Sequence, residues 1–329
     1  MTRFLSDSAL ERLREAADAP DLTGTRYQLV SKLGQGGMGG VFCVEDRELE
    51  RKVALKVISV PDPDGAWSAR LLQEARIIAK LEHPGIAPVH DAGVLPDGRP
   101  YYTMKLVQGQ RLDEYVAAAA NLSDRLRIFL RICDAVAFAH AHGVLHRDLK
   151  PANVMIGPFG EVLVMDWGLS KFLRVADSNG VTSKQNSGVG GEGPSAHSFG
   201  QETAHGSVLG TPGYMAPEQV RGDAKLDQRA DVYSLGALLQ FLIADALPVP
   251  KALTAIRSKA LASEPGQRYP SVPELATDVA HFLDGFAVSA YPEGPFAAGW
   301  RWIRRNQVWI LLLLAYMLAR TLLIFFRPR

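Results

Sequence analysis

Hydrophobic and polar positions follow two different patterns along this chain. From Tyr27, short runs of β-branched and aromatic residues between turn residues predict strands over 27–33, 41–45, 52–60, 86–92 and 99–107. One helix is expected among these strands, over 67–81, and a Pro-Gly pair ends it. Beyond Leu112 apolar residues recur at helical spacing, most clearly over 122–142. This order predicts an α+β fold with two unequal lobes.

Two other segments depart from these patterns. Residues 1–24 read as a short N-terminal extension, and residues 176–207 hold 13 Gly or Ser among 32 positions. So few large apolar side chains cannot offset the entropy lost when a chain is ordered. We therefore expect a flexible insert over 176–207.

The composition is that of a globular protein. Charged residues make up 22% and hydrophobic residues 47% of the 329 positions, which excludes a wholly disordered, collagenous or coiled-coil chain. The net charge of +1 argues against a nucleic-acid partner. Cys43 and Cys133 are too few for a disulfide framework, and we expect both to be packing residues.

Gly34, Gly36 and Gly39 complete the pattern G-x-G-x-x-G, in which glycines let the backbone approach phosphate oxygens. In dinucleotide-binding folds a helix follows this pattern directly. Here residues 40–44 follow, and their composition predicts a strand. The pattern favours a phosphate-binding flap between two strands, with an ordinary glycine-rich hairpin as the alternative.

Lys56 and Glu74 are charged residues within apolar elements. Lys56 shares a strand face with Ala54, whose small side chain leaves room for a flat ligand. Glu74 lies within the apolar stripe of the helix expected over 67–81. Because a buried carboxylate is costly unless it is paired, we expect Lys56 to be its partner. The alternatives are a solvated lysine and a glutamate that reaches water.

The most specific string of the sequence is His-Arg-Asp-Leu-Lys-Pro-Ala-Asn at 146–153. Asp148 can accept a proton from an attacking hydroxyl, and Lys150 can neutralise a phosphoryl group in transfer. Asn153 and Asp166 flank a predicted hairpin, so their side-chain oxygens should converge. Oxygen ligands beside phosphates suit Mg²⁺.

With these motifs the sequence resembles a eukaryotic-type protein kinase, specifically a bacterial membrane-anchored serine/threonine kinase. The motifs stand in family order: the glycine-rich loop, Val53-Ala54-Leu55-Lys56, Glu74, His146 to Asn153, Asp166-Trp167-Gly168 and Ala216-Pro217-Glu218. The resemblance covers residues 25–288 and implies a small β-rich N-lobe with one helix over 25–104 and a larger helical C-lobe over 105–288. Lys150 and the Gly-Thr-Pro-Gly-Tyr string at 210–214 resemble the serine/threonine branch.

The resemblance also implies a role for each site residue. Lys56 would hold the α- and β-phosphates of ATP and pair with Glu74. Asp148 would be the catalytic base, with Lys150 beside it. Asn153 and Asp166 would bind Mg²⁺, or Mn²⁺ in its place. The adenine and phosphate contacts would come from Leu33, Gly34, Gly36, Gly39, Val41, Ala54, Met104, Lys105 and Val107, with Met104 as the gatekeeper. Asp231 would brace the catalytic loop, and Arg268 would pair with Glu218.

The sequence departs from the family pattern in three ways. The activation segment, 166–218, is long at 53 residues. Asp231 and Arg268 are only 37 positions apart, so a helix that helps relatives dock substrates is expected to be absent. Trp167 replaces the usual Phe of the metal-binding tripeptide. In relatives an arginine at the position of Arg147 binds a phosphate on the activation segment. The candidate acceptors are Thr182, Ser183, Ser187, Ser195, Ser198, Thr203 and Ser207.

Residues 308–326 predict a single membrane-spanning helix. Their 19 positions are nearly all apolar, and a helix of that length is about 28 Å long, close to the hydrocarbon thickness. The apolar side chains outweigh the cost of Arg320 near one end. A buried or interfacial helix is the alternative. We expect a juxtamembrane segment over 289–307, an anchor in the lipid bilayer and a kinase domain on the cytoplasmic side.

The sequence therefore predicts an ATP- and Mg²⁺-dependent protein serine/threonine kinase, regulated by autophosphorylation of its activation segment. Its substrates would be Ser or Thr hydroxyls of proteins, including its own. The alternative is a membrane-tethered pseudokinase that serves as a nucleotide-binding scaffold. A small-molecule kinase of related fold is opposed by Ala216-Pro217-Glu218. A homodimer is left open.

Overall fold

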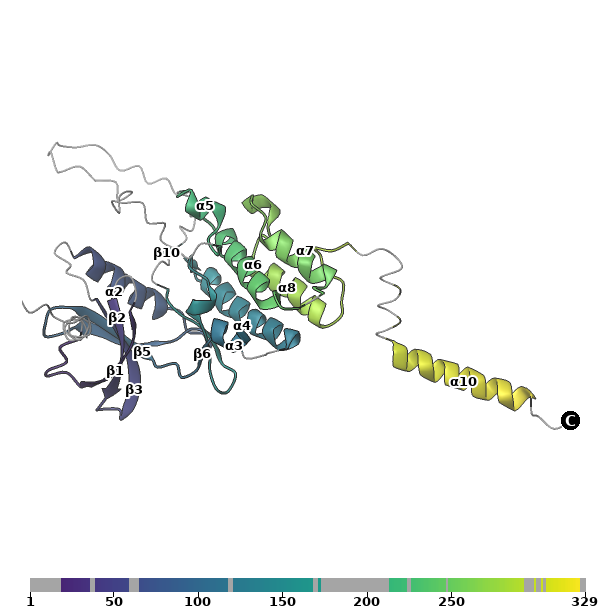
Figure 1. The fold of residues 1–329 in the computed structure, drawn as a ribbon, viewed down its shortest axis with the longest axis horizontal. Coiled ribbons are helices and arrows are strands. Elements are labelled where there is room, and N and C mark those ends of the chain that lie inside the picture. Colours follow the sequence, from purple (N-terminus) through teal and green to yellow (C-terminus); the bar gives the residue numbers. More distant parts are fainter. Residues whose placement is uncertain are drawn as a thin grey trace, which may run out of the picture.

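The computed structural model has a β-rich lobe, a helical lobe and a separate C-terminal helix (Figure 1). It describes residues 19–35, 39–58, 65–117, 121–167, 171–172, 213–223, 226–246, 248–292, 299, 303 and 306–325. Several sequence predictions lie outside these residues: most of the 1–24 extension, Gly36, the insert over 176–207 with its seven candidate acceptors, and residues 210–212 of the Gly-Thr-Pro-Gly-Tyr string.

The N-lobe is a five-stranded antiparallel sheet with one helix against it. In sheet order the strands are β1 (Tyr27–Gln35), β2 (Gly39–Asp46), β3 (Arg51–Ile58), β5 (Pro100–Lys105) and β4 (Val89–Val94). Helix α2 (Ala66–Ile78) packs on β3, β4 and β5. Val53, Leu55 and Val57 belong to a hydrophobic cluster on one face of the N-lobe sheet, separate from the main core. Ala54 and Lys56 therefore face the opposite side of the sheet, as the alternation predicts.

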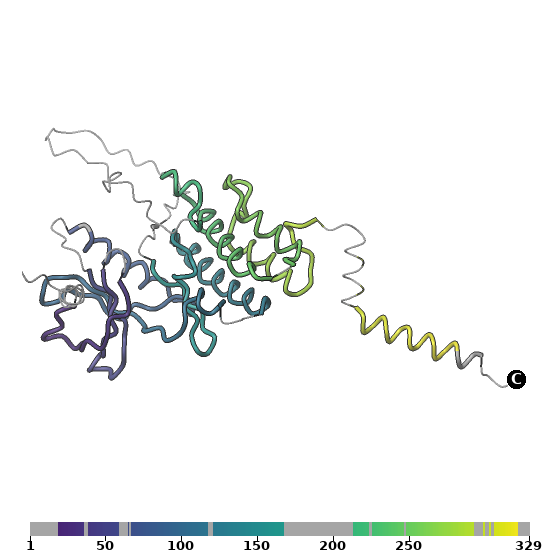
Figure 2. The backbone as a smooth tube through the Cα atoms, viewed as in Figure 1, coloured from purple at the N-terminus to yellow at the C-terminus, as the bar shows by residue number. Residues whose placement is uncertain are grey.

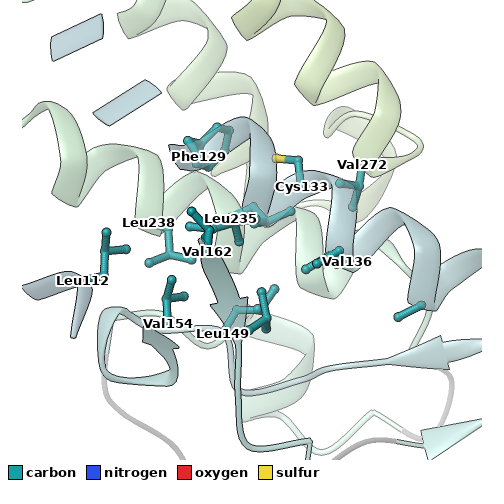
Figure 3. Packing of buried hydrophobic residues seen from close by; sticks show 14 of the residues in the cluster. Leu112, Phe129, Cys133, Val136, Leu149, Val154, Val162, Leu235, Leu238 and Val272 are labelled. Atoms are coloured by element: carbon teal, nitrogen blue, oxygen red, sulfur yellow. The ribbon is translucent and has the colours of Figure 1, made fainter. Parts of the chain in front are cut away.

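The C-lobe is built around α4 (Leu122–Ala141), α6 (Arg229–Ile243), α7 (Lys251–Ala260) and α8 (Val272–Leu283). Phe129, Cys133 and Leu235 meet in the core that these helices share (Figure 3). Smaller elements complete the lobe: β6 (Gln110–Arg111), α3 (Leu112–Ala117), β7 (Val144–Leu145), a 3₁₀ turn (Pro151–Asn153), β8 (Val154–Ile156), β9 (Val162–Val164), β10 (Lys171–Phe172), α5 (Pro217–Val220) and a second 3₁₀ turn (Pro265–Gln267). Helices α6 and α7 pack closely because Gly236 has no side chain: a Cβ atom there would lie 2.8 Å from Ala260 Cβ.

Two predicted element boundaries differ most from the structure. The helix predicted over 67–81 ends at Ile78, because the next amides form tighter bonds, from Lys80 to the carbonyl of Ile77 and from Leu81 to that of Ile78. The strand predicted from residue 86 begins only at Val89. Ile86 instead makes a parallel bridge with Val164 of the C-lobe and so joins the two lobes.

The C-terminal helix α10 (Gln307–Phe325) projects away from both lobes (Figure 2). Its apolar side chains up to Leu318 are mostly exposed, and Trp309 is 73% exposed. Among the described residues, no helix combines the length and apolar character needed to cross a bilayer. The predicted membrane-spanning helix over 308–326 ends at Phe326, which lies outside the described residues, and it stays a prediction.

Candidate active site

A cavity of about 800 Å³ lies between the two lobes and collects most of the predicted site residues. Those from the N-lobe and the segment joining the lobes are Leu33, Gly34, Gly39, Val41, Ala54, Lys56, Met104, Lys105 and Val107. Those from the C-lobe are Asp148, Lys150, Asn153 and Asp166. Glu74 reaches Lys56 from α2. Lys56 and Asp166, which are 110 positions apart in sequence, are thus brought around one space.

Gly34 on β1 and Gly39 on β2, two of the three glycines of the G-x-G-x-x-G pattern, line this cavity. A Cβ atom at Gly39 would come within 1.9 Å of the carbonyl oxygen of Val57, so only glycine fits where β2 passes β3. A Cβ atom at Gly34 would have no described atom within 4 Å. Gly39 is therefore required by strand packing, whereas Gly34 faces open space where a ligand can approach.

Lys56 forms ion pairs with two acids. Its ammonium nitrogen lies 2.8 Å and 3.0 Å from the two carboxylate oxygens of Glu74 and 3.1 Å from Asp166 Oδ1. Burial alone would lower the pKa of Lys56, but Tyr102, Glu74 and Asp166 together raise it above its ordinary value. Burial alone would raise the pKa of Asp166, but the charge of Lys56 holds it below its ordinary value. Lys56 is therefore a permanent cation that faces the cavity.

Asp148 is held by two neighbours from its own loop. Lys150 Nζ donates to Asp148 Oδ2 at 2.7 Å, and Asn153 Nδ2 donates to the same oxygen at 3.0 Å. Asn153 Nδ2 also donates to the main-chain carbonyl of Asp148 at 2.8 Å. Because both donors hold Oδ2, Oδ1 is the oxygen that can accept a proton from a bound hydroxyl.

Asn153 and Asp166 lie at the open end of the β8–β9 hairpin. The N–H of Met165 donates to the carbonyl of Asn153 at 2.8 Å, which ties the two ends of the hairpin together. Since the amide nitrogen of Asn153 is bound to Asp148, its amide oxygen is the atom that can bind a cation. With the Asp166 carboxylate it forms the kind of oxygen pair that fits Mg²⁺.

Asp231 of α6 braces residues 146–153, the predicted catalytic loop. Its carboxylate accepts the main-chain N–H groups of His146 and Arg147, each at 2.8 Å. His140 Nε2 of α4 lies 2.7 Å from Asp231 Oδ2. Arg147 has a φ of 71°, in the left-handed region, so the loop needs such bonds to keep its shape. The sequence provided no signal for the role of His140, because its partner is 91 positions away.

His146 joins the loop at 146–153 to the segment that holds Asp166 and Trp167 of the predicted metal-binding tripeptide. Its Nδ1 accepts the N–H of Asp148 at 3.2 Å, so Nε2 carries the proton and donates to the carbonyl of Met165 at 3.0 Å. The buried ring of Trp167 lies 4.5 Å from the His146 ring, and its Nε1 donates to the carbonyl of Val164 at 3.2 Å. The replacement of Phe by Trp is thus accommodated by an extra hydrogen bond.

Glu218 and Arg268 form a buried two-bond ion pair, as expected from the resemblance. The distances from the guanidinium nitrogens to the carboxylate oxygens are 2.6 Å and 2.8 Å. Arg268 also donates to the carbonyls of Ala262, Ser263 and Arg229. Burial alone would raise the pKa of Glu218, but the hydrogen bond from Arg268 lowers it. This pair fixes the end of the activation segment to the C-lobe.

The sequence interpretation missed several residues of the cavity. Met155 lies on β8 between the buried Val154 and Ile156, so its side chain lies on the opposite face and lines the cavity. Strand alternation in this short run could have identified it. Tyr102 also lines the cavity, and its hydroxyl donates to Glu74 Oε1 at 2.8 Å. That contact depends on the packing of α2 on β5, which no local pattern reveals.

Comparisons with known proteins agree with this geometry. Residues 27–288 match the family model described as protein kinase domain. The chain is 33% identical over 301 residues to serine/threonine-protein kinase PknD of Chlamydia muridarum, with 79% of this chain and 32% of the relative covered. PknD of Protochlamydia amoebophila is 33% identical over 306 residues, with 79% and 30% covered.

Solved structures give the same result. The crystal structure of the Mycobacterium tuberculosis PknI kinase domain matches with a TM-score of 0.55 and 27% identity, over 80% of this chain and 98% of that one. The curated relatives are much longer proteins, of which the chain covers about a third. The family match spans most of this chain, from the glycine-rich strands to the last helix of the C-lobe. The chain therefore belongs to the protein kinase family.

Proposed function

We propose that this protein is a serine/threonine protein kinase that transfers the γ-phosphoryl group of ATP to Ser or Thr hydroxyls of proteins. The observation that carries the proposal is the interlobe cavity, which is lined by Lys56, the partner of Glu74, and by the Asp148–Lys150 pair. The names of the PknD relatives support the serine/threonine class.

The chain's own residues can perform each part of this reaction. Lys56 is held by Glu74 as a cation that can bind the phosphates of ATP. Asp148 can take the proton of the acceptor hydroxyl, while Lys150, 2.7 Å from it, offsets the charge of the transferring group. Mg²⁺, which Asn153 and Asp166 would hold, neutralises phosphate charge when bound. Catalysis is then mostly positioning and charge stabilisation.

The test is transfer of radiolabelled phosphate from ATP to the full-length chain and to an added generic protein. The wild type should label both, and Lys56→Met and Asp166→Ala should abolish labelling. Phosphoserine and phosphothreonine should be found among the seven candidate acceptors of the activation segment. Binding of ATP without any transfer by the wild type would favour the pseudokinase alternative instead.

We propose further that α10 associates with a lipid bilayer, which would hold the kinase domain at the cytoplasmic side of a membrane. Support comes from its row of exposed apolar side chains, such as Leu311, Leu313 and Leu318. Cell fractionation tests this proposal. The wild type should sediment with membranes, and Leu311→Glu with Leu313→Glu should shift it to the supernatant. Equal distribution of both forms would contradict the proposal.

A further inference from the structure

Tyr102 is a buried tyrosine whose hydroxyl contacts the Lys56–Glu74 ion pair. It is 1% exposed, and its Oη donates to Glu74 Oε1 at 2.8 Å. The same Oε1 accepts Lys56 Nζ at 2.8 Å. One carboxylate oxygen of Glu74 therefore has two donors, one charged and one neutral.

The two donors reach Glu74 from neighbouring strands. Lys56 of β3 and Tyr102 of β5 are directly paired in the sheet, so their side chains lie side by side on one face. The Lys56 nitrogen lies 5.9 Å from the centre of the Tyr102 ring, over its face. Glu74 comes from α2, which packs across that face. Tyr102 thus connects α2 to the sheet without the help of Lys56.

This second connection matters because Lys56 has two tasks. When Lys56 binds phosphates, its three N–H groups are shared between the phosphates and Glu74. The carboxylate of Glu74 then loses some of the hydrogen bonds that Lys56 donates to it. The side chain of Glu74 is 1% exposed, so water cannot replace the missing donor. Burial raises the pKa of Tyr102 well above its ordinary value, so the phenol remains a neutral donor.

We propose that Tyr102 is a positioning residue whose hydroxyl holds Glu74, and with it α2, in place while Lys56 binds the phosphates of ATP. The proposal rests on the kinase function proposed above and concerns the same site. It predicts that α2 is held against the sheet by two independent bonds to Glu74, one from Lys56 of β3 and one from Tyr102 of β5.

Tyr102→Phe tests the proposal, because it removes the hydroxyl and keeps the ring. The matched control is Tyr101→Phe: Tyr101 is the preceding residue of β5, is 8% exposed, and packs edge-on against Tyr27 on the other face of the sheet. Tyr102→Phe should lower kcat/KM for ATP at least about fivefold, as expected for a lost hydrogen bond to a charged group. Tyr101→Phe should stay within about twofold of the wild type.

A second arm asks whether Tyr102 acts through Glu74. In a Glu74→Ala background, which removes the oxygen that accepts the tyrosine hydroxyl, Tyr102→Phe should change kcat/KM by less than about twofold, because the hydroxyl has already lost its partner. The proposal would be overturned if the losses in kcat/KM of the Tyr102 and Glu74 variants multiplied in the double variant. Equal losses in Tyr102→Phe and Tyr101→Phe would also overturn it, because they would indicate a general effect on packing. So would a Tyr102→Phe enzyme as active as the wild type.

Hydrogen exchange separates this proposal from the proposed function. The amides of α2 should exchange faster in Tyr102→Phe than in the wild type or Tyr101→Phe, both with and without ATP. This readout needs no turnover, so it tests Tyr102 even if the wild type transfers no phosphate, a result that would count against the kinase function alone. Unchanged exchange in α2 would refute the role of Tyr102.

Discussion

The side-chain amide of Gln219 donates a 3.1 Å hydrogen bond to the main-chain carbonyl oxygen of Arg147. Its Oε1 accepts the N–H of Ala216 at 3.1 Å, so one side chain closes the start of α5 and also contacts the catalytic loop. Arg147 has a left-handed φ of 71°, which must be held by its surroundings. Gln219 therefore couples the end of the activation segment to the backbone beside Asp148.

Replacing Gln219 should affect catalysis more than folding. Gln219→Ala removes both bonds, whereas Gln219→Glu can still accept the N–H of Ala216 but cannot donate to Arg147. Both variants lose the bond to Arg147 and should therefore lower kcat by about 2- to 10-fold, the worth of one neutral hydrogen bond. Steady-state kinetics with saturating ATP measure this. A full rate in Gln219→Glu would show that the bond to Arg147 is unimportant.

Breaking the Glu218–Arg268 pair should strongly destabilise the C-lobe. Glu218→Gln leaves the buried guanidinium of Arg268 without its counter-charge, and the loss is expected to be about 3–5 kcal/mol. The control is Arg221→Gln, which breaks a pair with Asp223 in which both side chains are about half exposed. That change should cost about 0–1 kcal/mol. Urea unfolding measures both, and similar losses would contradict the distinction.

Stability should fall in acid because of Asp231. Burial alone would raise its pKa, but the hydrogen bond from His140 and the N–H of Arg147 hold it below the ordinary value. The unfolded chain then binds more protons, so this contribution is fully present above the ordinary carboxyl pKa and is lost as the pH falls through the folded value. Glu218 and Asp278 also have lowered pKa values and act in the same direction.

Urea unfolding between about pH 5 and about pH 3 tests the contribution of Asp231. The free energy of unfolding should decrease as the pH falls, and Asp231→Asn should show a shallower decrease although it is less stable at neutral pH. Parallel curves for the two proteins would mean that Asp231 contributes nothing to the acid sensitivity.

The two described glycines of the phosphate flap should respond differently to alanine. Gly39→Ala forces a Cβ atom against the carbonyl of Val57, so β2 and β3 must separate, at a cost of about 1–3 kcal/mol. Gly34→Ala meets no described atom within 4 Å and should leave the melting temperature nearly unchanged. Thermal unfolding without nucleotide compares them, and an equal loss in both would refute the packing argument.

Asp148→Asn should separate chemistry from binding. The amide has nearly the same shape but cannot take the hydroxyl proton, so kcat should fall by about 10²–10⁴. The Kd for ATP should stay within about threefold, because no phosphate contact is assigned to Asp148. Single-turnover kinetics and equilibrium titration with ATP measure the two quantities. A loss of affinity alone would contradict the role of Asp148 as a base.

Much of the site was predictable because its chemistry lies in short strings. Asp148, Lys150 and Asn153 lie within six consecutive positions, and a local turn is enough to bring them together. Lys56 was predictable from strand alternation, and Glu74 from its place in an apolar helical stripe. The pairing of these two residues, 18 positions apart, followed from the cost of leaving a buried carboxylate alone.

The sequence by itself determined the order of the lobes, the motif residues and the need of Glu74 for a cation. Tertiary structure decided which further polar groups complete the site: Tyr102 beside Glu74, His140 beside Asp231, and Gln219 beside Arg147. Tyrosine, histidine and glutamine are common in many settings, so their spacing carries no signal. Their roles arise only when α2 packs on β5, α4 meets α6, and α5 contacts the catalytic loop, because a hydrogen bond requires donor and acceptor within about 3 Å.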